Sequence, residues 1–116
     1  TSIIDKYKPS KIFTHSSSDP HKDHRAVYEI VLGVLKNKEY PMYTFGVWNP
    51  IQVRDTNKPR LIVDVSKTFE KKLKALRLFE SQKLSVYQLL PNVFLKAKIS
   101  GWANKCKYAE VFYKVK

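Results

Sequence analysis

Cysteine is nearly absent from this 116-residue sequence, which contains only Cys106. A single cysteine excludes an internal disulfide and any metal site built from several thiolates. Long hydrophobic runs are also missing, so the sequence predicts no membrane-spanning helix. Because no charged segment followed by an apolar one marks a signal peptide, a cytoplasmic protein is the default expectation.

Acidic residues are scarce: 10 Asp and Glu stand against 22 Lys and Arg, which leaves a net charge of +12. Such an excess can indicate nucleic-acid binding, because phosphate groups are neutralised by clustered cations. The lysines here are spread along the whole chain, and one modest cluster, Lys71, Lys72 and Lys74, is most simply a solvated helix face. We expect no nucleic-acid partner. A non-catalytic basic module that binds nucleic acid or another polyanion is the alternative hypothesis.

The chain can bury one hydrophobic core, since 43% of its residues are hydrophobic, and a single domain over 1–116 is expected. Residue patterns predict strands at 11–14, 43–48, 61–65 and 108–115, and helices at 22 to 36–39, 66–82 and 85–103. Residues 2–7 look like the last turns of another helix. Strands that alternate with helices predict an α/β, Rossmann-like layered fold with a mostly parallel sheet. Because so few strands make a thin sheet, we expect the chain to be part of a larger domain.

The predicted helices carry specific expectations. The first should bury an apolar face made of Ala26, Val27, Ile30, Val31, Val34 and Leu35. Ser66 should cap the second, whose inward stripe is expected to be Phe69, Leu73, Leu76 and Phe79. Pro91 should interrupt the third, and Gly101 should close its last turn.

The three histidines of the chain, His15, His21 and His24, lie within ten residues of one another. They fall between a predicted strand and the following helix, the place where α/β proteins build ligand sites. Because residues three apart share a helix face, His21 and His24 can point at one ligand. The positive end of the helix dipole disfavours imidazolium, which keeps a histidine neutral and able to bind a metal.

Asp23 can pair with His21 only under one condition. Residues i and i+2 of a helix do not face each other, so His21 must lie before the helix begins, and we favour a start at Lys22. On spacing alone, a polar loop with incidental histidines explains the cluster equally well. A catalytic zinc usually takes three protein ligands, and the chain offers few obvious partners for His24.

A longer stretch of sequence around the histidines favours a functional site over incidental histidines. Asp19–Arg25, preceded by Lys8–His15, resembles the second motif of the LmbE-like (PIG-L type) zinc-dependent N-acetylglucosaminyl deacetylases, where a strand runs into a His-Pro-Asp-His-Arg turn. Weaker likenesses occur in the same order at 61–66, at Lys72, Ala75 and Ser81-Gln82, at Gly101, and at 108–112. The resemblance spans essentially the whole chain.

The resemblance implies a role for each residue of the motif. His24 matches the metal ligand, His21 matches the histidine that stabilises the oxyanion or protonates the leaving amine, and Asp23 matches the carboxylate that orients and charges that histidine. Lys22 stands where the family usually has proline. The family's other motif, His-Pro-Asp-Asp-Glu, which supplies two metal ligands and the general base, does not occur in this sequence.

The chain therefore resembles the carboxyl-terminal half of a hydrolase that removes an N-acetyl group from an N-acetylglucosamine-containing substrate. Zinc would be completed by ligands outside the chain, which alone should be inactive and bind zinc weakly at best. Arg54 is a candidate substrate-binding residue. His15 and Asp19 are candidates to orient the ring of His24 without binding the metal themselves. A non-catalytic subunit that kept this fold is a further hypothesis.

Overall fold

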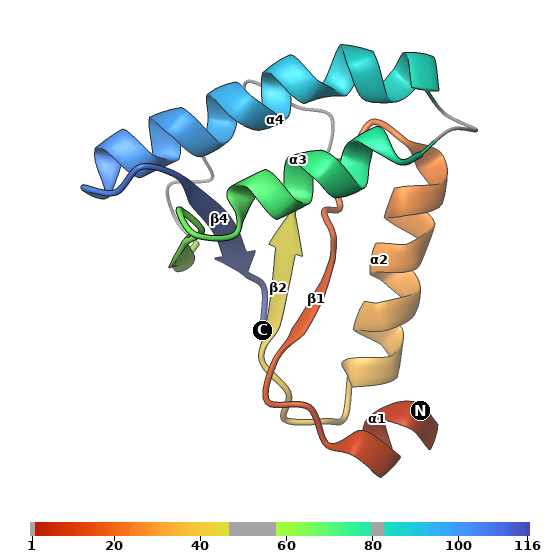
Figure 1. The fold of residues 1–116 in the computed structure, drawn as a ribbon. Helices are drawn as coiled ribbons and strands as arrows, with labels where there is room; N and C mark the ends of the chain where they lie inside the picture. Colours follow the sequence, from red (N-terminus) through yellow and green to blue (C-terminus); the bar gives the residue numbers. More distant parts are fainter. Residues whose placement is uncertain (1, 47–57, 80–82) are drawn as a thin grey trace. The chain divides into compact units, whose positions relative to one another are not determined.

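The computed structural model describes residues 2–46, 58–79 and 83–116. Within them lie α1 (Ser2–Tyr7), β1 (Ile12–His15), α2 (Lys22–Leu35), β2 (Met42–Phe45), β3 (Arg60–Asp64), α3 (Phe69–Arg77), α4 (Lys83–Ala103) and β4 (Ala109–Lys114) (Figure 1). The strands are hydrogen-bonded in the order β1-β2-β4-β3, with β1 parallel to β2 and β4 antiparallel to β2. The predicted α/β class is confirmed, in a mixed four-stranded sheet. No helix in the described ranges is long and apolar enough to span a bilayer.

The chain forms two compact units, Thr1–Leu61 with Phe112–Lys116, and Ile62–Val111. In the first unit, α2 lies against β1, which pairs with β2 (Figure 1). Tyr28, Leu35 and Met42 form the buried core of this unit. A crossover from β1 through α2 to a parallel β2 brings the end of β1 close to the start of α2.

The buried face of α2 differs from the predicted one. Val31 and Leu35 face the core, but Val27 and Ile30 are exposed, and Tyr28 is buried in their place. The inward residues 28, 31, 32 and 35 follow the helical repeat, shifted by about one position from the predicted stripe. The prediction counted only aliphatic residues, so it missed the ring that fixes the rotation of the helix.

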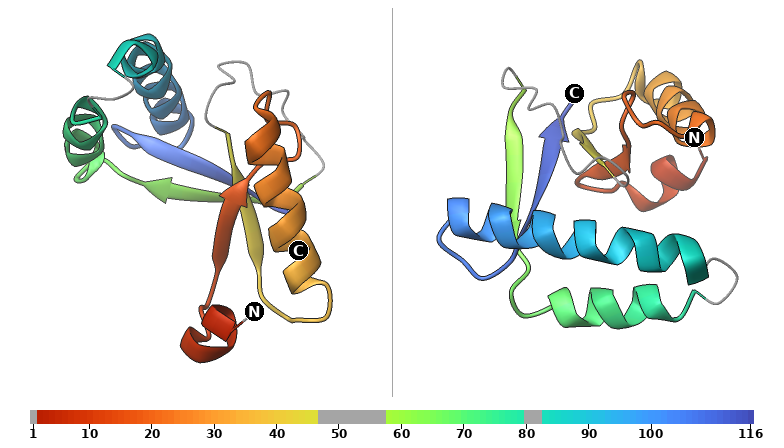
Figure 2. Two further views of the ribbon diagram at one scale, coloured as in Figure 1. Left: turned by 90° about the vertical axis from the view of Figure 1, so that its right-hand side faces the viewer. Right: turned by 90° about the horizontal axis from the view of Figure 1, so that it is seen from above.

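In the second unit, α3 and α4 lie side by side, as both views of Figure 2 show. Phe69 at the start of α3 is 1% exposed, and its ring stacks on Tyr108 at 4.3 Å between centroids. The prediction that Ser66 caps this helix is wrong, because α3 begins at Phe69. Ser66 instead joins two strands: its hydroxyl donates to Asp64 (2.6 Å) and accepts from the backbone N–H of Tyr108 (3.2 Å).

Two further predictions for this unit are wrong. Because α3 ends at Arg77, Phe79 lies beyond the helix and is 56% exposed instead of facing inward. Helix α4 continues through Pro91 without a break. Proline removes the hydrogen bond to the carbonyl of Tyr87, but Pro91 and Tyr87 are both exposed, so water can satisfy that carbonyl.

Gly101 lies inside the last turn of α4 and does not end it as predicted, because the helix continues to Ala103. A Cβ at Gly101 would lie 2.6 Å from the carbonyl oxygen of Lys107, whereas at Gly33 on α2 a Cβ would meet nothing within 4 Å. Gly101→Ala should therefore destabilise the chain by about 1–3 kcal/mol through overpacking. Gly33→Ala should stabilise it by about 0.5–1 kcal/mol, because alanine is the better helix former.

Urea denaturation of the 116-residue chain and of the two variants measures both effects. Because the two variants should change the free energy of unfolding in opposite directions, each is the control for the other. Equal stabilities would contradict the close approach of Lys107 to Gly101.

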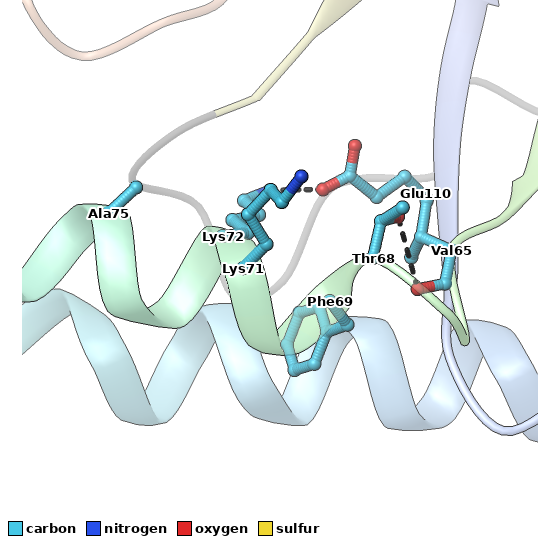
Figure 3. A pocket seen from close by; sticks show the side chains of 7 residues that line it. All are labelled: Val65, Thr68, Phe69, Lys71, Lys72, Ala75 and Glu110. Atoms are coloured by element: carbon cyan, nitrogen blue, oxygen red, sulfur yellow. Dashed lines mark hydrogen bonds and ion pairs between the residues drawn. The ribbon is translucent and has the colours of Figure 1, made fainter.

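A pocket of about 320 Å³ also opens in the second unit, beside the start of α3 (Figure 3). Val65, Phe69 and Ala75 supply apolar walls. Lys72 donates to Glu110 across the opening, as the dashed line in Figure 3 marks. Among the described residues, its lining includes one carboxylate and no imidazole or thiol.

Candidate metal centre

The histidine cluster lies in the loop that joins β1 to α2, within the first unit. His15 is the last residue of β1, and His21 is the N-cap of α2, which begins at Lys22. The predicted late start of the helix is confirmed. The ring Nδ1 of His21 accepts the backbone N–H of Asp23 (3.2 Å), which satisfies one of the free amides of the first turn.

Asp19 and Arg25 hold the loop in shape. The Oδ1 atom of Asp19 accepts the backbone N–H of His21 (2.9 Å). The guanidinium of Arg25 donates to the carbonyl oxygens of Asp19 (2.7 Å) and Pro20 (2.9 Å). These contacts span only a few residues, so the sequence 19–25 fixes the local geometry by itself.

Three side chains converge at this point: His15 from the strand, Asp19 from the loop and His24 from the first turn of α2. Their candidate ligand atoms all lie within 4.8 Å of one another. The rings of His15 and His24 stack with centroids 3.9 Å apart and planes 5° apart. Nδ1 of His24 is 3.0 Å from Oδ1 of Asp19, which is an ion-pair distance without hydrogen-bond geometry.

Buried polar atoms in the cluster lack partners. Nδ1 of His15, Oδ2 of Asp19 and Nδ1 of His24 have no hydrogen-bond partner in the described part of the chain. The side chain of Asp19 is only 1% exposed, so water does not readily replace a partner there. Such a buried group costs about 1–3 kcal/mol while it stays unsatisfied. One divalent cation can take a ligand atom from each of these three side chains, and imidazole nitrogen with carboxylate oxygen is a donor set that zinc accepts.

The protonation of His15 suits this role. Burial lowers the pKa of His15 below its ordinary value of 6.5, the neighbouring His24 acts in the same direction, and Asp19 opposes them. His15 is therefore neutral at neutral pH, the form that a metal requires.

His21 and Asp23 lie beside the cluster and are exposed. The ring of His21 stacks on His24 with centroids 4.7 Å apart. The Asp23 carboxylate is 3.8 Å from Nδ1 of His21. Because this Nδ1 already accepts the amide N–H of Asp23, the hydrogen-bond network assigns the proton of the neutral ring to Nε2. The expected charging of His21 by Asp23 stays a prediction.

The structure thus brings together His24, the predicted ligand, with His15 and Asp19, which were predicted only to support it. Arg54 lies outside the described residues. Sequence reasoning missed Phe45, whose ring centroid is 5.0 Å from that of His15. The parallel pairing of β1 with β2 is the feature that could have identified Phe45, because it places Phe45 opposite His15.

The fold matches about half of the chain of two solved deacetylases. The chain is similar to the zinc-inhibited form of teicoplanin deacetylase Orf2, with a TM-score of 0.75 and 19% identity over 97% of this chain and 47% of that one. It is also similar to a deacetylase of the teicoplanin biosynthesis pathway in complex with bog, with a TM-score of 0.76 and 20% identity over 97% of this chain and 48% of that one. No family model and no curated protein matches the sequence. At these identities the likeness shows the fold.

Proposed function

We propose that this chain is the carboxyl-terminal half of a zinc-dependent N-deacetylase acting on an N-acetylglucosamine-containing substrate. The observation that carries the proposal is the buried, unpartnered Oδ2 of Asp19 beside the rings of His15 and His24. The fold shared with solved deacetylases and the resemblance of Asp19–Arg25 to a deacetylase motif support it.

In this proposal His24 holds the metal, and Asp19 orients the His24 ring through the 3.0 Å approach of its carboxylate. The remaining oxygen of Asp19 and the ring of His15 are close enough to act as further donors. The structure therefore offers up to three donors where the sequence suggested one, and measurable zinc binding by the chain alone is expected. Zinc, when bound, lowers the pKa of a water molecule and polarises an amide carbonyl.

His21 acts on the substrate. Its Nε2–H can stabilise the oxyanion that forms when water adds to the carbonyl carbon, or can give a proton to the amine as the C–N bond breaks. The reaction leaves acetate and a free amino sugar. The Asp23 carboxylate lies 3.8 Å from Nδ1, close enough to orient the ring. Arg54 remains a candidate contact for the sugar.

Co-expression tests the proposal. The general base and the remaining ligands would come from a His-Pro-Asp-Asp-Glu segment outside this sequence, so the purified 116-residue chain should release no acetate from N-acetylglucosamine derivatives. Co-expression with a polypeptide that carries this motif should restore acetate release. In the restored complex, His21→Ala should lower kcat about 10²–10⁴-fold, as the loss of an acid-base group does.

Lys22→Ala serves as the matched control, because it changes the neighbouring exposed residue and should leave kcat near that of the wild type. Deacetylation by the chain alone would contradict the half-domain proposal. A zinc-loaded complex that releases no acetate would contradict the deacetylase function.

A further inference from the structure

Helix α4 of the second unit exposes large apolar side chains that the proposed function does not use. They lie between 44% and 75% exposed and are Leu84, Tyr87, Phe94, Leu95, Ile99 and Trp102. At about 100° per residue, these six positions fall on one arc of roughly 140°. We call this arc the α4 stripe.

The opposite side of the helix is already packed. Leu89 and Ala97 are buried, at 8% and 4% exposure, and they lie on the side away from the α4 stripe. Single exposed hydrophobic residues are ordinary, but a stripe of them on one helix face, here interrupted only by Gln88 and Lys98, marks an interaction surface. Helix α4 is therefore apolar on two sides, and its own unit covers only one of them.

The charges around the α4 stripe indicate what covers the other side. Residues 83–109 contain five lysines and no aspartate or glutamate; Lys98 lies on the arc of the α4 stripe, whereas Lys96 is partly buried away from it. The ammonium group of Lys98 lies 5.9 Å from the ring centroid of Trp102 and 5.4 Å from that of Tyr108. A second copy of this helix would bring lysines to face lysines, so a two-fold contact through the stripe is disfavoured.

An anionic bilayer complements both the apolar side chains of the α4 stripe and the lysines near it. Tryptophan and tyrosine are enriched at the level of lipid headgroups, where an apolar ring with a polar edge is best accommodated. Lysines beside an apolar face extend to anionic headgroups while their methylenes stay in the apolar layer. Each lysine near such a surface adds favourable electrostatic free energy that salt weakens.

We propose that the α4 stripe docks this chain on an anionic lipid surface, with the helix lying in the plane of the interface. The contact is peripheral and reversible. It is independent of the metal cluster, so it can be tested without zinc and without deacetylase activity.

Co-sedimentation of the 116-residue chain with lipid vesicles tests the proposal. Binding should be strong to phosphatidylcholine vesicles that contain phosphatidylglycerol and weak to phosphatidylcholine alone, and it should fall as salt is raised. Ile99→Glu and Trp102→Ser should each lower the partition coefficient about tenfold, because a charge or a lost ring in the interface opposes insertion. Far-ultraviolet circular dichroism checks that both variants stay helical.

Ile30→Glu on α2 is the matched control. Ile30 is 66% exposed, as exposed as the stripe residues, but it lies in the other unit, so its replacement should leave vesicle binding unchanged. The proposal is overturned if the chain binds neither kind of vesicle, or if the stripe variants bind as well as the wild type. Sedimentation equilibrium supplies the remaining outcome, since a dimer that Ile99→Glu dissociates would assign the stripe to a second copy and overturn lipid docking.

Discussion

Replacing His24 by alanine should weaken zinc binding by the 116-residue chain about a hundredfold or more, because it removes a ligand of the ion. The His24 ring joins the other two donors, with its Nδ1 3.0 Å from Asp19. Asp19→Asn should cost about 10–100-fold, the usual effect of losing the carboxylate that orients a ligating histidine.

Competition titration against a zinc-binding dye at neutral pH measures these affinities. Burial keeps the pKa of His15 below 6.5, so this ring is neutral under those conditions. Zinc affinity should fall as the pH is lowered through the range in which imidazoles gain protons, because protons compete with the metal. Glu29→Gln, an exposed position on α2, is the control and should bind zinc as the wild type does. A His24→Ala variant with unchanged zinc affinity would exclude the proposed metal centre.

Replacing Phe69 by alanine should destabilise the chain by about 3–5 kcal/mol, a large part of the stability of a small domain. Phe69 is 1% exposed, and its ring contacts Tyr108 and Phe94 at centroid distances of 4.3 and 6.3 Å. Alanine would leave a cavity where three rings now meet, and the loss combines apolar burial with ring packing.

Phe79→Ala is the control for this variant. Sequence pattern places both phenylalanines on one inward stripe, but Phe79 is 56% exposed, so its replacement should change stability by less than about 0.5 kcal/mol. Urea denaturation followed by circular dichroism measures both. An equal loss of stability in Phe69→Ala and Phe79→Ala would mean that the side chain of Phe79 is buried.

The difference between these two residues shows where sequence pattern succeeds. Element order and most boundaries could be predicted, because hydrophobic repeats and turn residues act locally; the start of α2 after His21 is an example. Sequence pattern predicts a cap at Ser66, because the actual partner of Ser66, the amide of Tyr108, is 42 residues away. Sequence pattern predicts a break at Pro91, because it does not reveal that Pro91 and Tyr87 lie on an exposed part of the helix. Long-range partners and the exposure of one helix face are tertiary facts.

The candidate site was more predictable than the packing. His15, Asp19 and His24 are close in sequence, so a strand followed by a helix is enough to gather them. Which of them supports and which binds depends on interatomic distances, and these come only from the structure. Arg54 depends on a segment outside the described residues and remains a prediction.

The short span between His15 and His24 has a consequence for how the donors assemble. Closing a loop of fewer than ten residues costs little chain entropy, and the cost grows only slowly with loop length. The hydrogen bonds of Asp19 and Arg25 with the backbone already order this loop without an ion. The donor side chains are therefore preorganised, and ordering the polypeptide would subtract little from the free energy of cation binding.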